Sequence, residues 1–222
     1  KEMGNQLIIS QERKQKLVEK WSKVVTRLNC KTELDQNTGG SGVYFDSSIF
    51  GKVDGFNGNI ILTNEHVLRE DDEYINYCEV DFLNEKNSKK LEEDGEEKIY
   101  TIISEELDIA YLDFGENNNS LVEDLQDEEF NICDFKLQKG DEILILGYPS
   151  IGSSEDITIT LGIISGYDDE FYMTDAKIAK GNSGGAAISI KHDCYFGIPT
   201  LVMKGKLEVM GRVLDVNNII SL

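Results

Sequence analysis

One short segment of the chain combines residue types that suit acyl-transfer chemistry. Residues 181–185 read GNSGG, with Ser183 between glycines. A serine hydroxyl is a weak nucleophile, so it needs a base to take its proton and donors to stabilise the oxyanion that forms. The glycines let the backbone bend tightly, so the N–H groups of Gly181 and Ser183 can point at one site as an oxyanion hole. The same residues also suit a plain turn between two strands.

A base for Ser183 must come from elsewhere in the chain, which contains only two histidines. His66 follows the apolar run 60–62, where a predicted strand ends, whereas His192 lies in a polar turn between two predicted strands. A histidine that leaves a buried strand is held rigidly, so we predict His66 as the base and His192 as an exposed turn residue. Taken alone, His66 also suits a structural histidine.

The orienting carboxylate is predicted from its surroundings. Asp108 stands between Leu107 and Ile109 at the start of an apolar strand, unlike most of the 42 acidic residues, which lie in polar runs. A carboxylate beside apolar groups needs a partner, because burial of a lone charge is costly. The imidazole of His66 is the partner we predict, and an ordinary aspartate at the start of a strand is the alternative.

The order His66, Asp108, Ser183, together with the segments around them, resembles the chymotrypsin-fold (trypsin-like) serine proteases, and most closely the HtrA-type branch. The resemblance runs from about residue 39 to 203. The segments that carry it, in chain order, are 40–43 (GSGV), 62–67 (LTNEHV), 107–110 (LDIA), 147–149 (GYP), 162–166 (GIISG), 174–176 (TDA) and 181–185 (GNSGG).

This resemblance implies an all-β fold of two six-stranded antiparallel barrels with the active site in the cleft between them. His66 and Asp108 would come from the first barrel and Ser183 from the second. The implied activity is that of a serine endopeptidase, which cleaves a polypeptide substrate through an acyl-enzyme without a metal or organic cofactor. The oxyanion hole would be formed by the N–H groups of Gly181 and Ser183.

Substrate-binding residues are suggested by the same resemblance. The residue six before the nucleophile can lie at the floor of the specificity pocket; here it is Lys177, which would favour an acidic residue before the scissile bond. A lysine that points to solvent is the alternative. Gly197, Ile198 and Thr200 are predicted to lie on the strand that pairs with an extended substrate. Pro199 has no N–H to donate, which removes one hydrogen bond if this position faces the substrate.

Two readings of the activity remain open beside an active endopeptidase. HtrA proteases usually carry a PDZ domain after the protease domain, and the roughly twenty residues after Met203 are too few for one. One reading is therefore the protease domain of a larger protein, controlled by a regulatory domain or partner protein. The other reading is a catalytically silent trypsin-fold binding module.

The elements that would position these residues follow from apolar periodicity. Leu17, Val18 and Trp21 recur at helical spacing, which predicts a helix over about 11–22 and a strand over about 23–30, although one longer helix also fits. We expect an N-terminal helical segment, 1–22, and a protease domain, 23–222, whose first barrel ends near 130 and whose second covers 131–222. The charge-rich segments 84–98 and 116–129 are predicted as solvated loops, with a short helix open in the second. Further strands are predicted at 42–45, 59–63, 78–83, 98–103, 109–114, 142–146, 158–164, 171–174, 186–190 and 195–203.

Composition excludes several classes of partner. The 222 residues include 22 Lys and Arg against 42 Asp and Glu, a net charge of −20, which argues against nucleic acid and anionic membrane surfaces. No apolar run is long enough to span a bilayer. The four cysteines lie far apart without a CxxC pair, so a zinc site is not expected, and we predict reduced thiols in a cytoplasmic protein.

Overall fold

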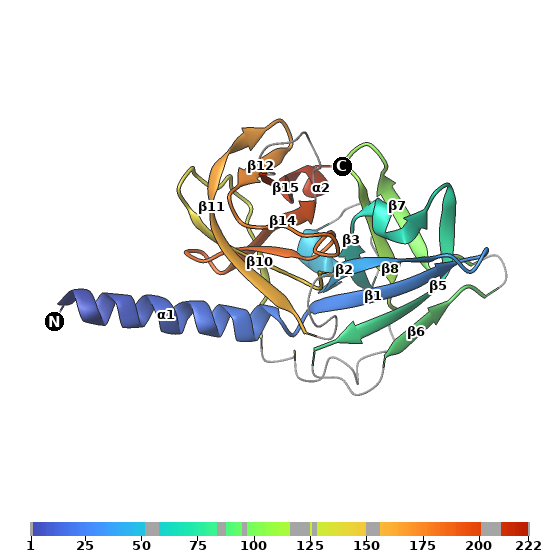
Figure 1. The fold of residues 1–222 in the computed structure, drawn as a ribbon, viewed down its shortest axis with the longest axis horizontal. Helices are drawn as coiled ribbons and strands as arrows, with labels where there is room; N and C mark the ends of the chain where they lie inside the picture. Colours follow the sequence, from blue (N-terminus) through green and yellow to red (C-terminus); the bar gives the residue numbers. More distant parts are fainter. Residues whose placement is uncertain are drawn as a thin grey trace.

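The computed structural model describes residues 2–51, 58–83, 88–94, 97–115, 125, 128–149, 156–200 and 210–221, the first eight of them by their backbone only. Two β-sheets lie side by side, and one long helix runs out from the body of the molecule (Figure 1). The predicted all-β fold with a single N-terminal helix is confirmed.

The first sheet is a curled half-barrel of eight strands rather than a closed barrel. Its order is β4-β5-β1-β2-β3-β8-β7, and β6 pairs with β5 beside this path. All pairings are antiparallel, which fits a chain that turns back after each short strand. The strands are β1 (Val25–Thr32), β2 (Asn37–Asp46), β3 (Asn59–Thr63), β4 (Arg69–Glu70), β5 (Glu73–Phe82), β6 (Lys89–Glu92), β7 (Tyr100–Ser104) and β8 (Ile109–Asp113).

The second sheet contains a closed six-stranded barrel. Its strands follow the order β13-β10-β11-β12-β15-β14, and a β13–β14 pairing closes the ring, while β9 joins β14 in parallel. The short helix α2 (Asn217–Ile220) ends the described chain. The strands are β9 (Asn131–Ile132), β10 (Glu142–Gly147), β11 (Thr158–Asp168), β12 (Phe171–Thr174), β13 (Ala186–Ser189), β14 (Cys194–Thr200) and β15 (Gly211–Asp215).

The predicted elements are mostly present, with corrections at their ends. The strands β4, β6, β9 and β15 were not expected from the sequence. Most notably, β6 lies inside the charge-rich segment that was predicted as a loop, because the inward side chain of Leu91 is buried while its neighbours stay at the surface. The predicted end of the last strand, 201–203, and most of 116–129, including the short helix left open there, lie outside the described residues.

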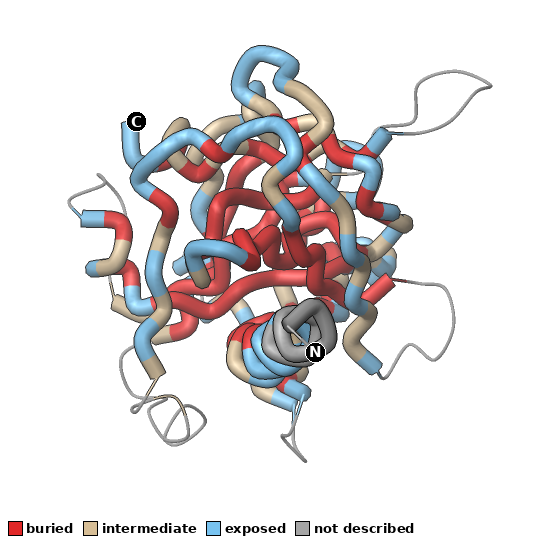
Figure 2. The backbone as a smooth tube through the Cα atoms, turned by 90° about the vertical axis from the view of Figure 1, so that its left-hand side faces the viewer, coloured by how far each residue is buried: buried red, intermediate tan, exposed pale blue. Residues whose placement is uncertain are grey.

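Two apolar clusters make up the core. The larger cluster joins side chains of the half-barrel with residues on the outer face of the second sheet, such as Leu146, Ile188 and Tyr195, so it continues across the junction between the sheets. The smaller cluster fills the closed barrel. Buried backbone therefore occupies the centre of the molecule (Figure 2). This shared core fixes the two sheets against each other.

The N-terminal helix α1 (Glu2–Trp21) is longer than the predicted 11–22, and the following strand begins at Val25 rather than 23. Leu17 and Trp21 are buried against the body, and the Trp21 ring packs edge-on against Phe130 with centroids 5.1 Å apart. Figure 2 shows this helix end-on, beside the body of the molecule. The apolar stripe read from the sequence is thus core packing.

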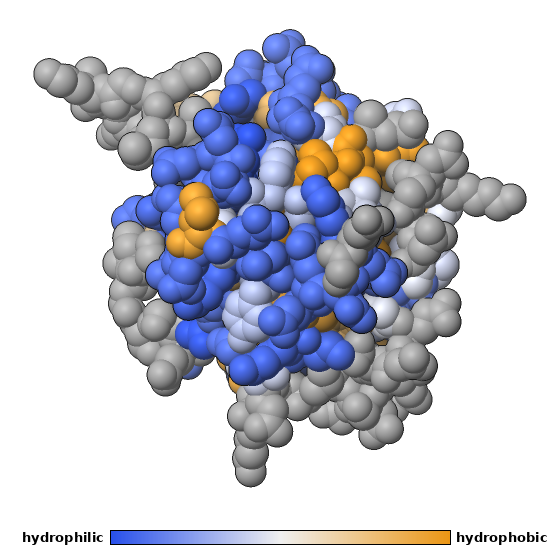
Figure 3. Space-filling view, turned by 90° about the vertical axis from the view of Figure 1, so that its right-hand side faces the viewer, coloured by the Kyte–Doolittle hydropathy of each residue, from blue (hydrophilic) through white to orange (hydrophobic). Residues whose placement is uncertain are grey.

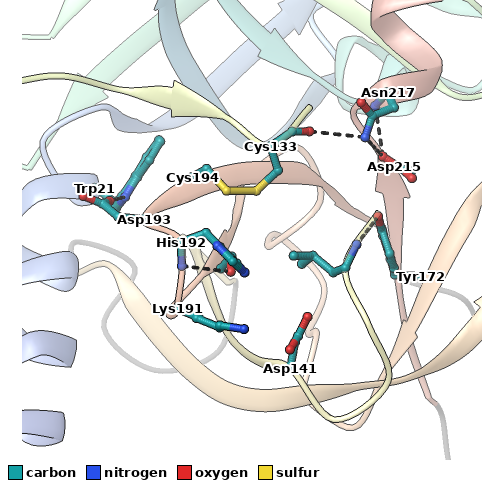
Figure 4. The surroundings of a disulfide bond; sticks show 12 residues. Trp21, Cys133, Asp141, Tyr172, Lys191, His192, Asp193, Cys194, Asp215 and Asn217 are labelled. Carbon is teal, nitrogen blue, oxygen red and sulfur yellow. Dashed lines mark hydrogen bonds between the residues drawn. A yellow bond between two sulfur atoms is a disulfide. The ribbon is translucent and has the colours of Figure 1, made fainter. Parts of the chain in front are cut away.

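Basic residues of this N-terminal segment pair with acidic groups of the second half of the chain. Lys14 binds Glu142 at 2.6 Å, Lys20 binds Asp193 at 2.8 Å and Lys23 binds Glu128 at 2.7 Å. Asp193 also accepts the indole N–H of Trp21 at 2.8 Å (Figure 4). The helix is therefore held by charge as well as by apolar packing, in a protein whose net charge is strongly negative.

All four cysteines form disulfides, so the prediction of reduced thiols is wrong. Cys30 bonds Cys78 between the paired strands β1 and β5. Cys133, just after β9, bonds Cys194 at the start of β14 (Figure 4). The cytoplasmic location stays a prediction, without the support of reduced thiols.

The surface matches the composition. On the face shown in Figure 3, hydrophilic side chains cover most of the described surface and separate hydrophobic areas interrupt them. Within the described part of the chain, no helix combines the length and apolar character needed to cross a membrane.

Candidate active site

Strand pairing brings His66 and Asp108 together. The residues 64–66 follow β3 directly, Asp108 directly precedes β8, and these strands pair with Thr63 opposite Ala110. The Nδ1 atom of His66 lies 2.7 Å from Oδ2 of Asp108, and the backbone N–H of His66 donates to Oδ1 of Asp108 at 2.9 Å. One carboxylate thus contacts both the ring and the backbone of the histidine; the sequence had suggested only the contact with the ring.

The backbone of Asp108 is anchored as firmly as its side chain. Asp108 has a φ of +58°, a left-handed conformation that aspartate tolerates better than most residues. Its carbonyl oxygen accepts the Glu65 N–H at 3.2 Å and the side-chain N–H of Asn64 at 2.9 Å. The His66 side chain remains 46% exposed and that of Asp108 25% exposed, so the imidazole can still meet a substrate.

A buried carboxylate stands next to the histidine. Glu65 accepts the Tyr74 O–H at 2.6 Å and lies 3.3 Å from a guanidinium nitrogen of Arg69. Burial, reinforced by the hydrogen bond to Glu65, raises the pKa of Tyr74 to about 12. The phenol therefore stays protonated and keeps donating to Glu65 at neutral pH.

The Ser183 loop contains a defined turn. The Asn182 N–H donates to the Ala179 carbonyl at 3.0 Å, and Gly181 between them has a φ of +99° while Lys180 is not left-handed. These features define a type II turn, in which the third residue requires positive φ. Relative to a type I turn, the central peptide is flipped, and that peptide carries the Gly181 N–H.

The two N–H groups predicted for the oxyanion hole are not used inside the loop. Among the described residues, no backbone carbonyl accepts a hydrogen bond from the N–H of Gly181 or of Ser183. Ser183 itself is buried, with only 5% of its surface exposed. The N–H of the buried Ser183 needs an acceptor, which a bound carbonyl oxygen would supply, and the N–H of the partly exposed Gly181 can donate to the same oxygen.

The serine loop lies against the half-barrel beside the end of β3. Ser41 of β2 donates its N–H to the Ser183 carbonyl at 2.9 Å, and Thr63, three residues before His66, donates to the Ser41 carbonyl at 2.7 Å. The structure therefore seats the Ser183 backbone on the half-barrel near the end of β3. Among the described residues, His66 and Asp108 are joined by hydrogen bonds, whereas the side chains of His66 and Ser183 are not. Sequence reasoning gave no role to Ser41, Thr63 or Asn64, although the segments 40–43 and 62–67 were singled out.

The predicted substrate-binding residues have different surroundings. Gly197 and Ile198 are buried, and β14 runs between β13 and β15, with Gly197 paired on both sides. Thr200 stands at the end of β14 and accepts the Asn64 side-chain N–H at 3.0 Å. Within β14, the pairing with β13 ends at Gly197, so only the end of this strand offers a free edge for substrate. Pro199 faces Val213 of β15, and its carbonyl accepts the Gly184 N–H at 3.3 Å.

Lys177 is exposed, and its carbonyl accepts the Thr160 hydroxyl at 2.9 Å. This exposure favours the solvent-facing alternative, and a role in the specificity pocket stays a prediction. His192 is an exposed turn residue as predicted, with its ring against Phe135.

The trypsin-like peptidase domain family matches residues 40–198, which include all three predicted catalytic residues. The chain belongs to the trypsin-like peptidase family. This trypsin-like domain is 28% identical, over 158 residues, to a probable periplasmic serine endoprotease, DegP-like, of Bartonella henselae. The match covers 67% of this chain and 26% of that protein, so the chain spans about a quarter of its relative's length.

The fold of this trypsin-like domain is also that of a solved HtrA-type protease. The structure of the HtrA-type protease AlgW with a tripeptide superposes with a TM-score of 0.60 and 22% sequence identity. The superposition covers 92% of this chain and 60% of that chain. It supports the two-sheet architecture described above.

Proposed function

We propose that this chain is a serine endopeptidase domain in which Ser183 is the nucleophile, His66 the general base and Asp108 the residue that orients the base. The observation that carries the proposal is that the Asp108 carboxylate contacts His66 twice, at the ring atom Nδ1 and at the backbone N–H. A carboxylate in this position keeps the proton on Nδ1 and leaves Nε2 free to accept the proton of a serine hydroxyl.

The reaction then proceeds by acyl transfer. Ser183 attacks the peptide carbonyl as His66 takes its proton, and the negative charge on the carbonyl oxygen is met by the N–H groups of Gly181 and Ser183. His66 protonates the leaving amine, so the peptide bond breaks and an ester remains on Ser183. Water, deprotonated by His66, then attacks the ester and releases the second product.

The type II turn supports an assembled rather than a latent site. Flipping the central peptide of the Ala179–Asn182 turn would redirect the Gly181 N–H and remove one oxyanion donor. The loss of one such donor costs about 10²–10³ in kcat. Among the described residues no backbone carbonyl accepts from this donor, which favours an active enzyme over a silent binding module.

Polypeptides are the substrates we propose, with the end of β14 at Thr200 as the edge for an extended chain. Regulation by a further domain or a partner protein belongs to the same proposal. The negative net charge would slow the approach of acidic substrates, which argues against an acidic preference at Lys177. Cleavage of glutamate-containing peptides faster than neutral ones would reverse that view.

Fluorophosphonate labelling followed by intact-mass measurement tests the proposal. We expect one adduct on the parent protein, mapped to Ser183, and none on Ser183→Ala. Ser189→Ala is the matched control, because Ser189 is a buried serine of β13 outside the site, and it should be labelled like the parent. No adduct on the parent would contradict the proposal and favour the binding module, and an equal adduct on Ser183→Ala would contradict Ser183 as the nucleophile.

A further inference from the structure

Ser41 is fully buried in β2, and its hydroxyl, its N–H and its carbonyl all make hydrogen bonds. Its hydroxyl donates to the Gly181 carbonyl at 2.7 Å and accepts the Tyr148 N–H at 2.8 Å. Its N–H donates to the Ser183 carbonyl at 2.9 Å. These contacts join a strand of the half-barrel to two loops of the second sheet.

The two carbonyls that Ser41 holds belong to the residues whose N–H groups are the proposed oxyanion donors. The Gly181 carbonyl and the Asn182 N–H are parts of one peptide group, which is fixed at its oxygen by Ser41 and at its nitrogen by Ala179. A peptide group is planar, so two such hydrogen bonds fix its orientation. The N–H groups of Gly181 and Ser183 are therefore positioned relative to the half-barrel by the side chain and the backbone N–H of Ser41.

The histidine side of the site is tied to the same residue. The Thr63 hydroxyl donates to the Ser41 carbonyl at 2.7 Å, and Thr63 is the last residue of β3 before the segment that carries His66. Gly184 packs against both residues: a Cβ atom there would lie 2.1 Å from the Ser41 carbonyl oxygen and 2.1 Å from the Thr63 hydroxyl oxygen. The serine loop is thus seated directly on the Ser41–Thr63 pair.

We propose that Ser41 is a positioning residue of the reaction, which sets the place of the serine loop and its oxyanion donors relative to His66. The inference rests on the proposed serine endopeptidase function and deepens it. Ser41 does not touch the reacting atoms. It acts through the Gly181 and Ser183 carbonyls, and loss of its hydroxyl removes this partner from the partly buried Gly181 carbonyl and from the buried Tyr148 N–H.

Kinetics of Ser41→Ala on a fluorescently labelled unfolded protein test this role. We expect kcat to fall by ~10- to 100-fold, approaching the loss of one oxyanion donor, while KM changes by less than ~3-fold. The midpoint of the acid limb of the pH–rate profile should not move, because Ser41 makes no contact with the His66–Asp108 pair. Ser189→Ala is the control for loss of a buried serine hydroxyl and should keep parental kcat.

Thr63 offers a second, independent pair of variants. Thr63→Val keeps the shape but removes the hydroxyl that anchors Ser41, so kcat should fall in the same way; Thr63→Ser keeps the hydroxyl and should retain most of the activity. Because Thr63 acts through Ser41, the double variant Ser41→Ala/Thr63→Val should lose less than the product of the two single losses. A fully multiplicative loss would contradict a shared action.

A crystal structure of Ser41→Ala separates this inference from the proposed function. We expect the Gly181 and Ser183 backbones to shift relative to β3. An unshifted loop, or a kcat equal to that of Ser189→Ala, overturns the role of Ser41 whether or not Ser183 is the nucleophile. Conversely, a parent protein that takes no fluorophosphonate adduct refutes the proposed function, and the loop position in the variant crystal still decides whether Ser41 holds the loop.

Discussion

The Asp108→Asn variant gives the sharpest test of the site, because each of the two carboxylate oxygens of Asp108 contacts a different group of His66. Oδ1 of Asp108 accepts the His66 backbone N–H at 2.9 Å, and Oδ2 faces Nδ1 of His66 at 2.7 Å. An asparagine has one acceptor oxygen and one NH2 group. The backbone N–H can only donate, so the amide oxygen must face it, and the NH2 group must then face Nδ1.

This arrangement forces the wrong tautomer of His66. With an NH2 group opposite, Nδ1 has to act as an acceptor, and the ring proton moves to Nε2, the atom that should accept the serine proton. We expect kcat at neutral pH to fall by ~10⁴, which corresponds to a barrier higher by ~5 kcal/mol. KM should change little, because substrate contacts are retained.

The measurement combines kcat on a labelled protein substrate, the rate of fluorophosphonate labelling and ¹⁵N NMR of the imidazole. Asp113→Asn is the matched control, since Asp113 is an exposed aspartate at the other end of β8 and should leave activity unchanged. A loss of less than ~10-fold in Asp108→Asn, or an imidazole that still carries its proton on Nδ1, would refute this reasoning.

Three further outcomes follow from described features. Gly184→Ala should abolish fluorophosphonate labelling, because a Cβ atom there would lie 2.1 Å from each of two oxygens. Gly140 also has a positive φ but faces open space, so Gly140→Ala should be labelled like the parent. Equal labelling of the two variants would contradict the close packing around Gly184. Replacing Cys133 and Cys194 together by serine should lower the free energy of unfolding, measured in urea, by up to ~4 kcal/mol for a 61-residue separation, and an unchanged value would contradict the bond. Burial raises the pKa of Tyr44 to about 12 in the folded protein, from about 10 in the unfolded chain. The stabilisation from this ring is therefore complete below pH ~10 and is lost as the pH rises toward 12. Absorbance at 295 nm should show the ring ionising above pH ~10 together with unfolding, whereas a reversible titration near pH ~10 would contradict this reasoning.

Local patterns predicted the chemistry better than the architecture. His66 and Asp108 sit at strand boundaries that apolar runs mark clearly, and pairing of those strands brings them together. The strand β6 was missed because a strand that buries one side chain in four has almost no apolar signal. Its charged residues are indistinguishable from a solvated loop until the partner strand is known.

Long-range contacts account for the remaining errors. The cysteine pairs are separated by 48 and 61 residues, so spacing alone gave no sign of bonding. Ser41 reaches Tyr148 and Gly181, which lie 107 and 140 residues further along the chain. A small serine in a strand becomes informative only when three-dimensional packing shows that all its polar groups are buried and used.

The placement of the two disulfides has a mechanical consequence. Cys30 and Cys78 are both in the half-barrel sheet. Cys133, which directly follows β9, and Cys194 both lie in the half of the molecule that contains the second sheet. Each disulfide therefore joins two residues of the same half, and neither connects the two halves. Covalent bracing stiffens each half, whereas only packing and hydrogen bonds resist relative movement of the halves. We therefore expect the molecule to deform most easily at the junction between the two halves, where the proposed catalytic residues lie. A force that separates the two halves would change the distance between His66 and Ser183 before it deformed either half.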